Sequence, residues 1–152
     1  MAQRREIIRL LIDNLKLIDG TSSPFNHRYR FKSNVYENVY KGFKGIDEIN
    51  DFPSIFVTGG QETREYNTLN NIKSILNITI RGYLYNEEYE LANEDVNNLI
   101  QDIDHIIYNL PKKHTNLEIM DITIASISTD EGLLTPYGIV ELQVQASYEV
   151  NL

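Results

Sequence analysis

Apolar residues recur at helical spacing near the start of the chain. Within residues 2–18 they form one stripe, and most of the charged residues fall elsewhere, which is the pattern of an amphipathic helix. Gly20 suits the left-handed position that often follows a helix, so we expect the helix to end near it. The stripe comprises Ile8, Leu11, Leu15 and Ile18.

A longer apolar stripe predicts a second helix that ends at about Leu110. Asn86 suits its N-cap and Pro111 its end. Acidic residues in the first turn and basic residues after the last turn complement the helix dipole. The stripe consists of Val96, Leu99, Ile100, Ile103, Ile106, Ile107 and Leu110; the acidic residues are Glu87, Glu88 and Glu90; the basic ones are Lys112, Lys113 and His114.

Runs of β-branched and aromatic residues predict several strands. Residues 74–85 alternate most regularly and predict a central strand, with Ile78 and Ile80 on one face. Gly59 and Gly60 are expected to end the strand that precedes it. The other expectations are strands at 35–43 and 54–58, a turn or short helix at 44–53, a long loop at 61–71, and a strand or an arm at 25–32.

Two long strands, residues 117–129 and 138–150, are predicted at the end of the chain. The second alternates strictly between apolar and polar side chains, so one face should be buried and the other exposed to solvent. At about 3.3 Å per residue each strand spans roughly 43 Å, so we expect this hairpin to project towards a partner. The element order predicts an α+β fold: a single mostly antiparallel (mixed) β-sheet with two helices packed on one face and a long C-terminal β-hairpin.

The composition is typical of one globular domain spanning residues 1–152, with 41% hydrophobic and 24% charged residues. No apolar run approaches the roughly 18 residues of a membrane span, so no membrane partner is expected. The basic start leads into an amphipathic pattern, so no secretion signal is expected. The absence of cysteine excludes disulfides and thiolate sites. A formal net charge of −8 disfavours wrapping of DNA.

The sequence carries no recognisable catalytic constellation. His27, His105 and His114 lack the spacing of metal ligands, and Gly59-Gly60 lacks the residues that complete a phosphate-binding loop. The serines lack a nucleophile elbow, and the carboxylates show no spacing that indicates a paired acid and base. We therefore expect no catalytic residue, no metal site, no cofactor and no enzymatic activity.

One basic and aromatic run allows two interpretations. Arg28, Arg30 and Lys32 alternate with Tyr29 and Phe31. Such a run could bind nucleic acid, with cations on phosphates and rings stacked on bases. The same alternation also arises when the two rings point into a core and the cations point into solvent.

The connection between the last two strands holds more apolar residues than a hairpin turn needs. Leu133, Leu134 and Tyr137 lie there beside Asp130 and Glu131. Apolar side chains at a loop tip usually indicate contact with a partner. The alternative is that they fold back on the core of the domain.

Several short sequence motifs follow one another along nearly the whole chain. They are the early helix, Glu-Ile-Asn-Asp-Phe-Pro-Ser-Ile-Phe-Val at 48–57, Gly-Gly-Gln-Glu at 59–62, Ile-Arg-Gly-Tyr at 80–83, the helix from Ala92, Asp-Glu-Gly at 130–132 and Pro-Tyr-Gly at 136–138. Together they resemble the tail terminator, or tail completion, proteins of long-tailed bacteriophages, the minor tail protein U-like family.

This resemblance implies a non-enzymatic virion subunit at the head-proximal end of the tail, assembled in the host cytoplasm. Such subunits form a ring, commonly a hexamer, that caps the tail tube protein at its final length and then meets the neck or connector protein. DNA would pass through the ring lumen without sequence-specific binding, which suits a negative net charge. The 130–137 residues and the 28–32 cations are then candidates for interfaces.

The sequence is also compatible with two other functions. A head-to-tail joining protein of the same fold would differ only in the neighbour that it touches. A small nucleic-acid-binding module would use Arg28, Arg30 and Lys32.

Overall fold

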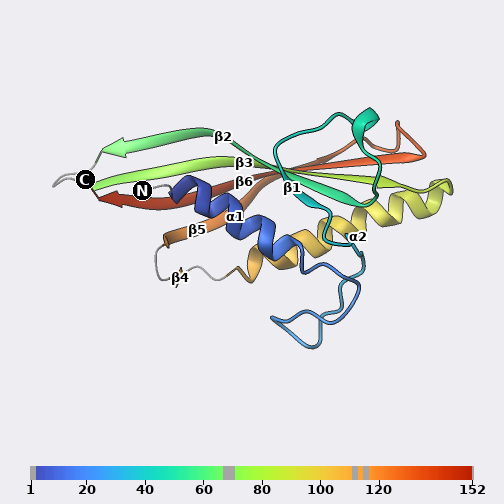
Figure 1. Ribbon diagram of the computed structural model, residues 1–152, viewed down its shortest axis with the longest axis horizontal. Helices are drawn as coiled ribbons and strands as arrows, with labels where there is room; N and C mark the ends of the chain where they lie inside the picture. The colour runs from blue at the N-terminus through green and yellow to red at the C-terminus, as the bar shows by residue number, and fades with distance from the viewer. Residues whose placement is uncertain (1–2, 67–70, 111–112, 115–116, 152) are drawn as a thin grey trace.

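The computed structural model describes residues 3–66, 71–110, 113–114 and 117–151. These residues form one six-stranded sheet, in the order β1-β2-β3-β6-β5-β4, and two α-helices (Figure 1). The elements are α1 (Gln3–Leu15), β1 (Val39–Lys41), the 3-10 helix η1 (Ile46–Glu48), β2 (Ser54–Tyr66), β3 (Asn71–Tyr85), α2 (Tyr89–Tyr108), β4 (Lys113–His114), β5 (Leu117–Thr129) and β6 (Tyr137–Asn151).

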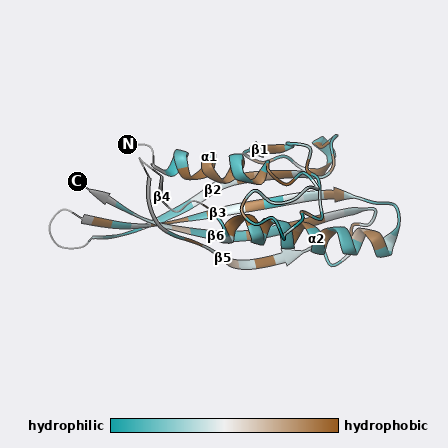
Figure 2. Cartoon of the chain, turned by 90° about the horizontal axis from the view of Figure 1, so that it is seen from below, coloured by the Kyte–Doolittle hydropathy of each residue, from teal (hydrophilic) through white to brown (hydrophobic). Residues whose placement is uncertain are grey.

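The sheet is mostly antiparallel, with β1 alone of the described strands running parallel to its neighbour, β2. Both helices pack against the same face and share one core with it. Figure 2 shows hydrophobic and hydrophilic residues alternating along both helices. The predicted α+β fold with a mixed sheet is therefore confirmed.

Strand β3 lies at the centre of the sheet, as its alternation predicts. Ile78 and Ile80 are fully buried on the helix side, whereas Thr79 and Arg81 point to the other face and are only half-buried. Gly82 continues the helix-side row, and a Cβ built there would lie 2.8 Å from Leu99 Cδ2. The missing side chain thus lets α2 pack closely against the middle of the sheet.

The ends of both helices differ from the prediction. Helix α1 ends at Leu15, and Gly20, with φ +79°, lies in the loop beyond it instead of closing the helix. Helix α2 begins at Tyr89, so Asn86 precedes the helix and is not its N-cap. The Asn86 Oδ1 instead accepts a hydrogen bond from the Glu88 backbone N–H, forming a turn that leads into the helix.

The segment predicted as a long loop at 61–71 belongs largely to two strands. Gly59 and Gly60 do not end β2, which continues to Tyr66, and β3 already begins at Asn71. Residues 67–70 lie outside the described part of the chain. The prediction failed because a glycine pair followed by polar residues is also what an exposed strand end contains.

The glycine pair serves the contact between α1 and β2. A Cβ built at Gly59 would lie 2.7 Å from Ile8 Cδ1, so any larger residue would require the Ile8 side chain to shift. The Arg4 side chain donates a hydrogen bond of 2.6 Å to the Gly60 carbonyl. The register with β3 shifts between Gly59 and Glu62, so the strand bends here and does not stop.

Glu62, just after this bend, fastens β2 to β6. Tyr148 donates a hydrogen bond to the Glu62 carboxylate, and Arg64 forms an ion pair with it at 2.8 Å. Burial and the bond to Glu62 raise the pKa of Tyr148 to about 12. Burial also raises the pKa of Glu62, but the two donated hydrogen bonds outweigh it and keep that pKa below its ordinary value.

The C-terminal hairpin, β5 and β6, matches its predicted bounds closely but does not project from the sheet. Strand β6 pairs with β3 along its whole length, from Tyr137 opposite Tyr85 to Asn151 opposite Asn71. The ends of β2, β3 and β6 extend instead beyond the start of α1 (Figure 1).

The strand predicted at 35–43 is shortened to β1, because Tyr36 and Glu37 adopt positive φ values in a turn. The short helix predicted within 44–53 is confirmed as η1. Neither helix in the described ranges combines the length and apolar character needed to cross a membrane.

Gly82→Ala should lower the free energy of unfolding by about 1–3 kcal/mol, the usual effect of overpacking a core. The added methyl group would meet both Leu99 and Val140 at 2.8 Å. Gly45→Ala is the matched control, because no heavy atom lies within 4 Å of its Cβ position and its φ is −69°. Urea unfolding of the three proteins tests this; equal midpoints would contradict the packing described for Gly82.

Candidate functional site

The turn that joins β5 to β6, residues 130–136, is held in shape by its own hydrogen bonds. The Asp130 carboxylate accepts hydrogen bonds from the backbone N–H groups of Leu134 and Ile139, at 3.1 and 3.3 Å. The Thr135 hydroxyl donates one of 2.7 Å to the Gly132 carbonyl. Asp130 is therefore occupied in shaping the turn and is not presented to solvent as a free charge.

The ordered turn exposes large apolar side chains. Leu133 is 84% exposed and Leu134 is 45% exposed, so Leu133 does not fold back on the core. The Tyr89 ring lies under the turn, with its hydroxyl 3.3 Å from the Cβ position of Gly132. We call the tip surface the set Tyr89, Glu131, Leu133, Leu134 and Tyr137.

The tip surface is acidic as well as apolar. Glu131 is exposed, and the start of α2 brings exposed carboxylates beside Tyr89. Tyr85 and Phe52 support Tyr137 from behind, with ring centroids 5.2 and 5.8 Å from its own. The added carboxylates are those of Glu87, Glu88 and Glu90.

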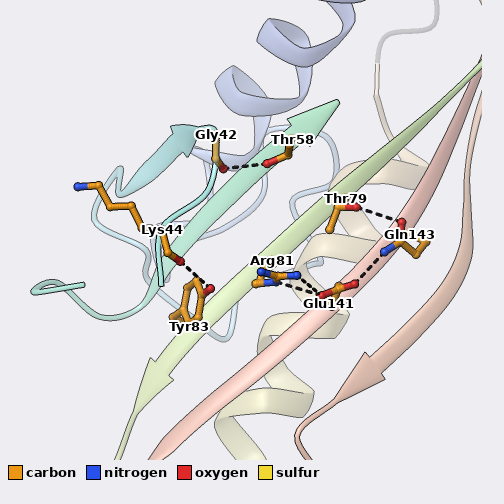
Figure 3. A network of polar contacts seen from close by, with 8 residues as sticks. All are labelled: Gly42, Lys44, Thr58, Thr79, Arg81, Tyr83, Glu141 and Gln143. Atoms are coloured by element: carbon orange, nitrogen blue, oxygen red, sulfur yellow. Dashed lines mark hydrogen bonds and ion pairs between the residues drawn. The ribbon is translucent and has the colours of Figure 1, made fainter. Parts of the chain in front are cut away.

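The face of the sheet opposite the helices carries a connected set of polar side chains (Figure 3). Arg81 Nη2 lies 2.6 Å from Glu141 Oε2, and Gln143 donates to the other oxygen of Glu141 at 2.9 Å. Thr79 donates to Gln143 at 3.1 Å, and the Phe43 ring lies 4.4 Å below the Arg81 guanidinium. These groups satisfy one another, which favours a structural role over a chemical one.

Two hydrogen bonds fasten the loop after β1 across the end of this face (Figure 3). Tyr83 donates to the Lys44 carbonyl and Thr58 to the Gly42 carbonyl, both at 2.9 Å. Burial raises the pKa of Tyr83, which keeps its hydroxyl protonated as a donor.

Residues 19–35 do not form a strand of the sheet. They form an arm that packs on α2. Tyr29 stacks on His105 with ring centroids 3.9 Å apart and planes 6° apart, and Phe31 is buried. Arg28, Arg30 and Lys32 are exposed. The rings thus point inward and the cations outward, so neither ring is free to stack on a base.

Asp102 anchors the arm from the middle of α2. Its buried carboxylate accepts hydrogen bonds from the Tyr29 hydroxyl at 2.7 Å and from the backbone N–H groups of Lys32 and Ser33. His105, one turn later, contacts the Ser23 hydroxyl at 2.7 Å. Asp102 and His105 are therefore occupied by packing the arm. The described ranges contain no cluster of three potential metal ligands.

Comparison with known proteins shows the family of the chain. Residues 1–151 match the family described as Bacteriophage Tail Tube Terminator Protein. The chain belongs to this family. The resemblance seen in the sequence to phage tail terminators is thereby confirmed.

One relative of this tail tube terminator chain is the Tail tube terminator protein p142 of Escherichia phage T5. It is 30% identical over 160 aligned residues, covering 98% of this chain and 95% of that protein. Among solved structures, a chain titled "Virion of native gene transfer agent (GTA) particle" aligns with a TM-score of 0.48 and 10% identity, covering 74% of this chain and 79% of that one.

The structure of this terminator chain also contains a groove that the sequence did not reveal. It runs between α1 and the edge strand β1, and its two adjoining halves measure about 400 and 370 Å³. No local pattern predicts it, because it depends on where β1 pairs. The residues that line this α1–β1 groove are Arg4, Arg5, Ile8, Arg9, Ile12, Val39, Tyr40, Lys41, Gly42, Val57, Thr58 and Gly59.

Asp102→Ala should lower the free energy of unfolding by about 2–3 kcal/mol, because it removes a charged acceptor from several donors at once. Asp104→Ala, an exposed carboxylate two residues later, is the control and should change it by less than about 0.5 kcal/mol. Denaturant unfolding measures both; similar losses in the two variants would contradict the anchoring role.

The stability of the protein should fall as the pH drops below about 6.5, partly through His105. Burial lowers the pKa of His105 below its ordinary 6.5, against opposing effects of Asp102 and Asp104. The unfolded chain then binds this proton more readily, so unfolding is favoured as the pH falls from the unfolded pKa to the folded one.

His105→Gln should flatten this part of the profile of unfolding free energy against pH. His27→Gln, at an exposed histidine of the arm, is the control. A profile that is unchanged in His105→Gln would show that the decline has another origin.

Proposed function

We propose that the chain is the subunit of a ring that ends growth of the tail tube at its head-proximal end and then joins the tail to the neck of the head. Membership of the tail tube terminator family supports this role. The observation that carries it is the tip surface: an ordered turn that displays Leu133, which is 84% exposed, beside the exposed Leu134 and Tyr137. A turn shaped in advance loses little conformational entropy on binding, so it suits docking.

A ring places specific demands on its subunit. Each copy must offer two different patches that fit each other, so that the contact repeats around an axis until the ring closes. We propose six copies, with the two ring faces contacting the tail tube protein and the neck or connector protein. The role is structural, without catalysis or a cofactor, in a virion assembled in the host cytoplasm.

Charge is consistent with passage of DNA through such a ring. Asp and Glu total 22 against 14 for Lys and Arg. An excess of carboxylates in a lumen would let phosphates slide without being held. The Arg28, Arg30 and Lys32 cations of the arm are candidates for protein contacts, since the rings between them are covered.

Polymerisation of the tail tube protein in the presence of this chain tests the proposal. At amounts far below one copy per tube subunit, the chain should halt elongation, and negative-stain images should show a ring at one end of each tube. Native mass spectrometry should give a closed oligomer of the 17.6 kDa chain. An unrelated acidic protein of similar size serves as the control. A chain that stays monomeric and leaves tube length unchanged would overturn the proposal.

A further inference from the structure

The α1–β1 groove combines an apolar floor with several cations. Ile8 and Ile12 from α1 lie along it, opposite Val39 from β1. The half of the groove next to Gly59 has a volume of about 400 Å³, which equals that of about a dozen waters at roughly 30 Å³ each. The groove is therefore large enough for apolar side chains of a partner and not only for solvent.

Three cations of this groove form no ion pair within the described residues. Arg5, Arg9 and Lys41 are all exposed, and the ion pairs within the described residues involve none of them. Arg4 contacts the Gly60 carbonyl. A cation in the first turn of a helix also opposes the helix dipole, so the position of Arg5 is unfavourable in the isolated chain. In a chain of net charge −8, this is a concentrated positive patch.

The tip surface has the opposite character. Leu133 and Leu134 project from it, and Glu131 stands beside them with its side chain exposed. Positive φ values at Glu131 and Gly132, +56° and +79°, turn the chain sharply at this point. An acidic, leucine-bearing projection thus exists on the same chain as a basic, apolar groove.

These two surfaces lie towards opposite sides of the sheet. Strand β1 forms one edge, whereas the turn leaves β5, which is separated from β1 by β2, β3 and β6. One copy cannot fill its own groove with its own turn. A second copy can, and the contact then leaves one free groove and one free turn for further copies.

We propose that the 130–136 turn of one copy enters the α1–β1 groove of the next. Leu133 packs against Ile8 and Ile12, and Glu131 lies among Arg5, Arg9 and Lys41. The inference rests on the ring proposed above and assigns its contact. A second copy is a better occupant of the groove than the tube or neck protein, because every copy carries both complementary surfaces. In a closed ring, each groove therefore receives a turn and each turn enters a groove.

Two variants that each damage one surface test the interface. The groove variant is Arg5→Glu/Arg9→Glu, and the tip variant is Glu131→Gln/Leu133→Ser, so that the two damaged surfaces do not attract each other. Rings dissociate below a certain protein concentration. Each variant alone should raise this concentration about tenfold or more, because a charge pair or a central apolar anchor is lost. The groove-matched control, Lys16→Glu/Lys44→Glu, makes the same charge change at exposed positions outside both surfaces, and Tyr108→Ser is the apolar control.

Mixing the two variants gives the decisive result. The groove variant keeps an intact turn and the tip variant keeps an intact groove, so together they can make one sound contact but no ring. Sedimentation velocity should show a one-to-one dimer of about twice 17.6 kDa. Variants Arg5→Gln/Arg9→Gln and Leu133→Ser replace any variant whose unfolding midpoint falls below that of the wild type.

The possible outcomes separate this inference from the ring itself. Rings formed by either variant alone at wild-type concentrations, or a mixture that stays monomeric while the wild type forms rings, would overturn the interface and leave the ring intact. A wild-type chain that forms no ring, with or without tail tubes, would overturn the proposed function and this interface with it.

Discussion

Packing of α2 against the middle of the sheet is the contact on which the rest of the molecule depends. Gly82 leaves the space into which Leu99 fits, and the stripe around Leu99 is buried against β3 and β6. Both helices occupy this one face, and the loop after β1 covers only one end of the opposite face. Its polar side chains satisfy one another across β3 and β6.

This arrangement frees the edges and ends of the sheet for contacts with other molecules. The domain buries its core without help, and its buried charge, Asp102, is fully engaged in holding the arm. Among the described residues, the most exposed large hydrophobic side chain is Leu133, at 84%. A rigid body that presents a shaped turn at one place and a groove at another suits a subunit whose work is assembly.

The parts of the fold that could be predicted are those set by local periodicity. The α2 stripe, the alternation of β3 and the two closing strands fix their own faces, because a shift by one residue would expose the apolar set. The Leu133 turn was also recognisable, since leucines in a hairpin connection are unusual. The Asp102 anchor left a weak signal: it lies beside the apolar stripe, one turn from Leu99 and from Ile106.

The parts that could not be predicted depend on tertiary neighbours. Gly59 reads as a strand end, yet it is where Ile8 approaches β2. Strand β1 is only three residues long and pairs with β2 in parallel, so neither its position nor the groove beside it is encoded locally. In the sequence, Arg5 and Arg9 resemble the solvent-exposed face of any amphipathic helix. Only the position of β1 opposite them makes them part of a groove.

Hydrogen–deuterium exchange, compared between the free chain and the chain bound at the end of a tail tube, tests most directly how this domain assembles. We expect new protection in residues 130–137 and along the start of α1 and β1, with β3 and β6 protected equally in both states. New protection confined to the arm or to the polar face of the sheet, with the turn still exchanging freely, would contradict this expectation.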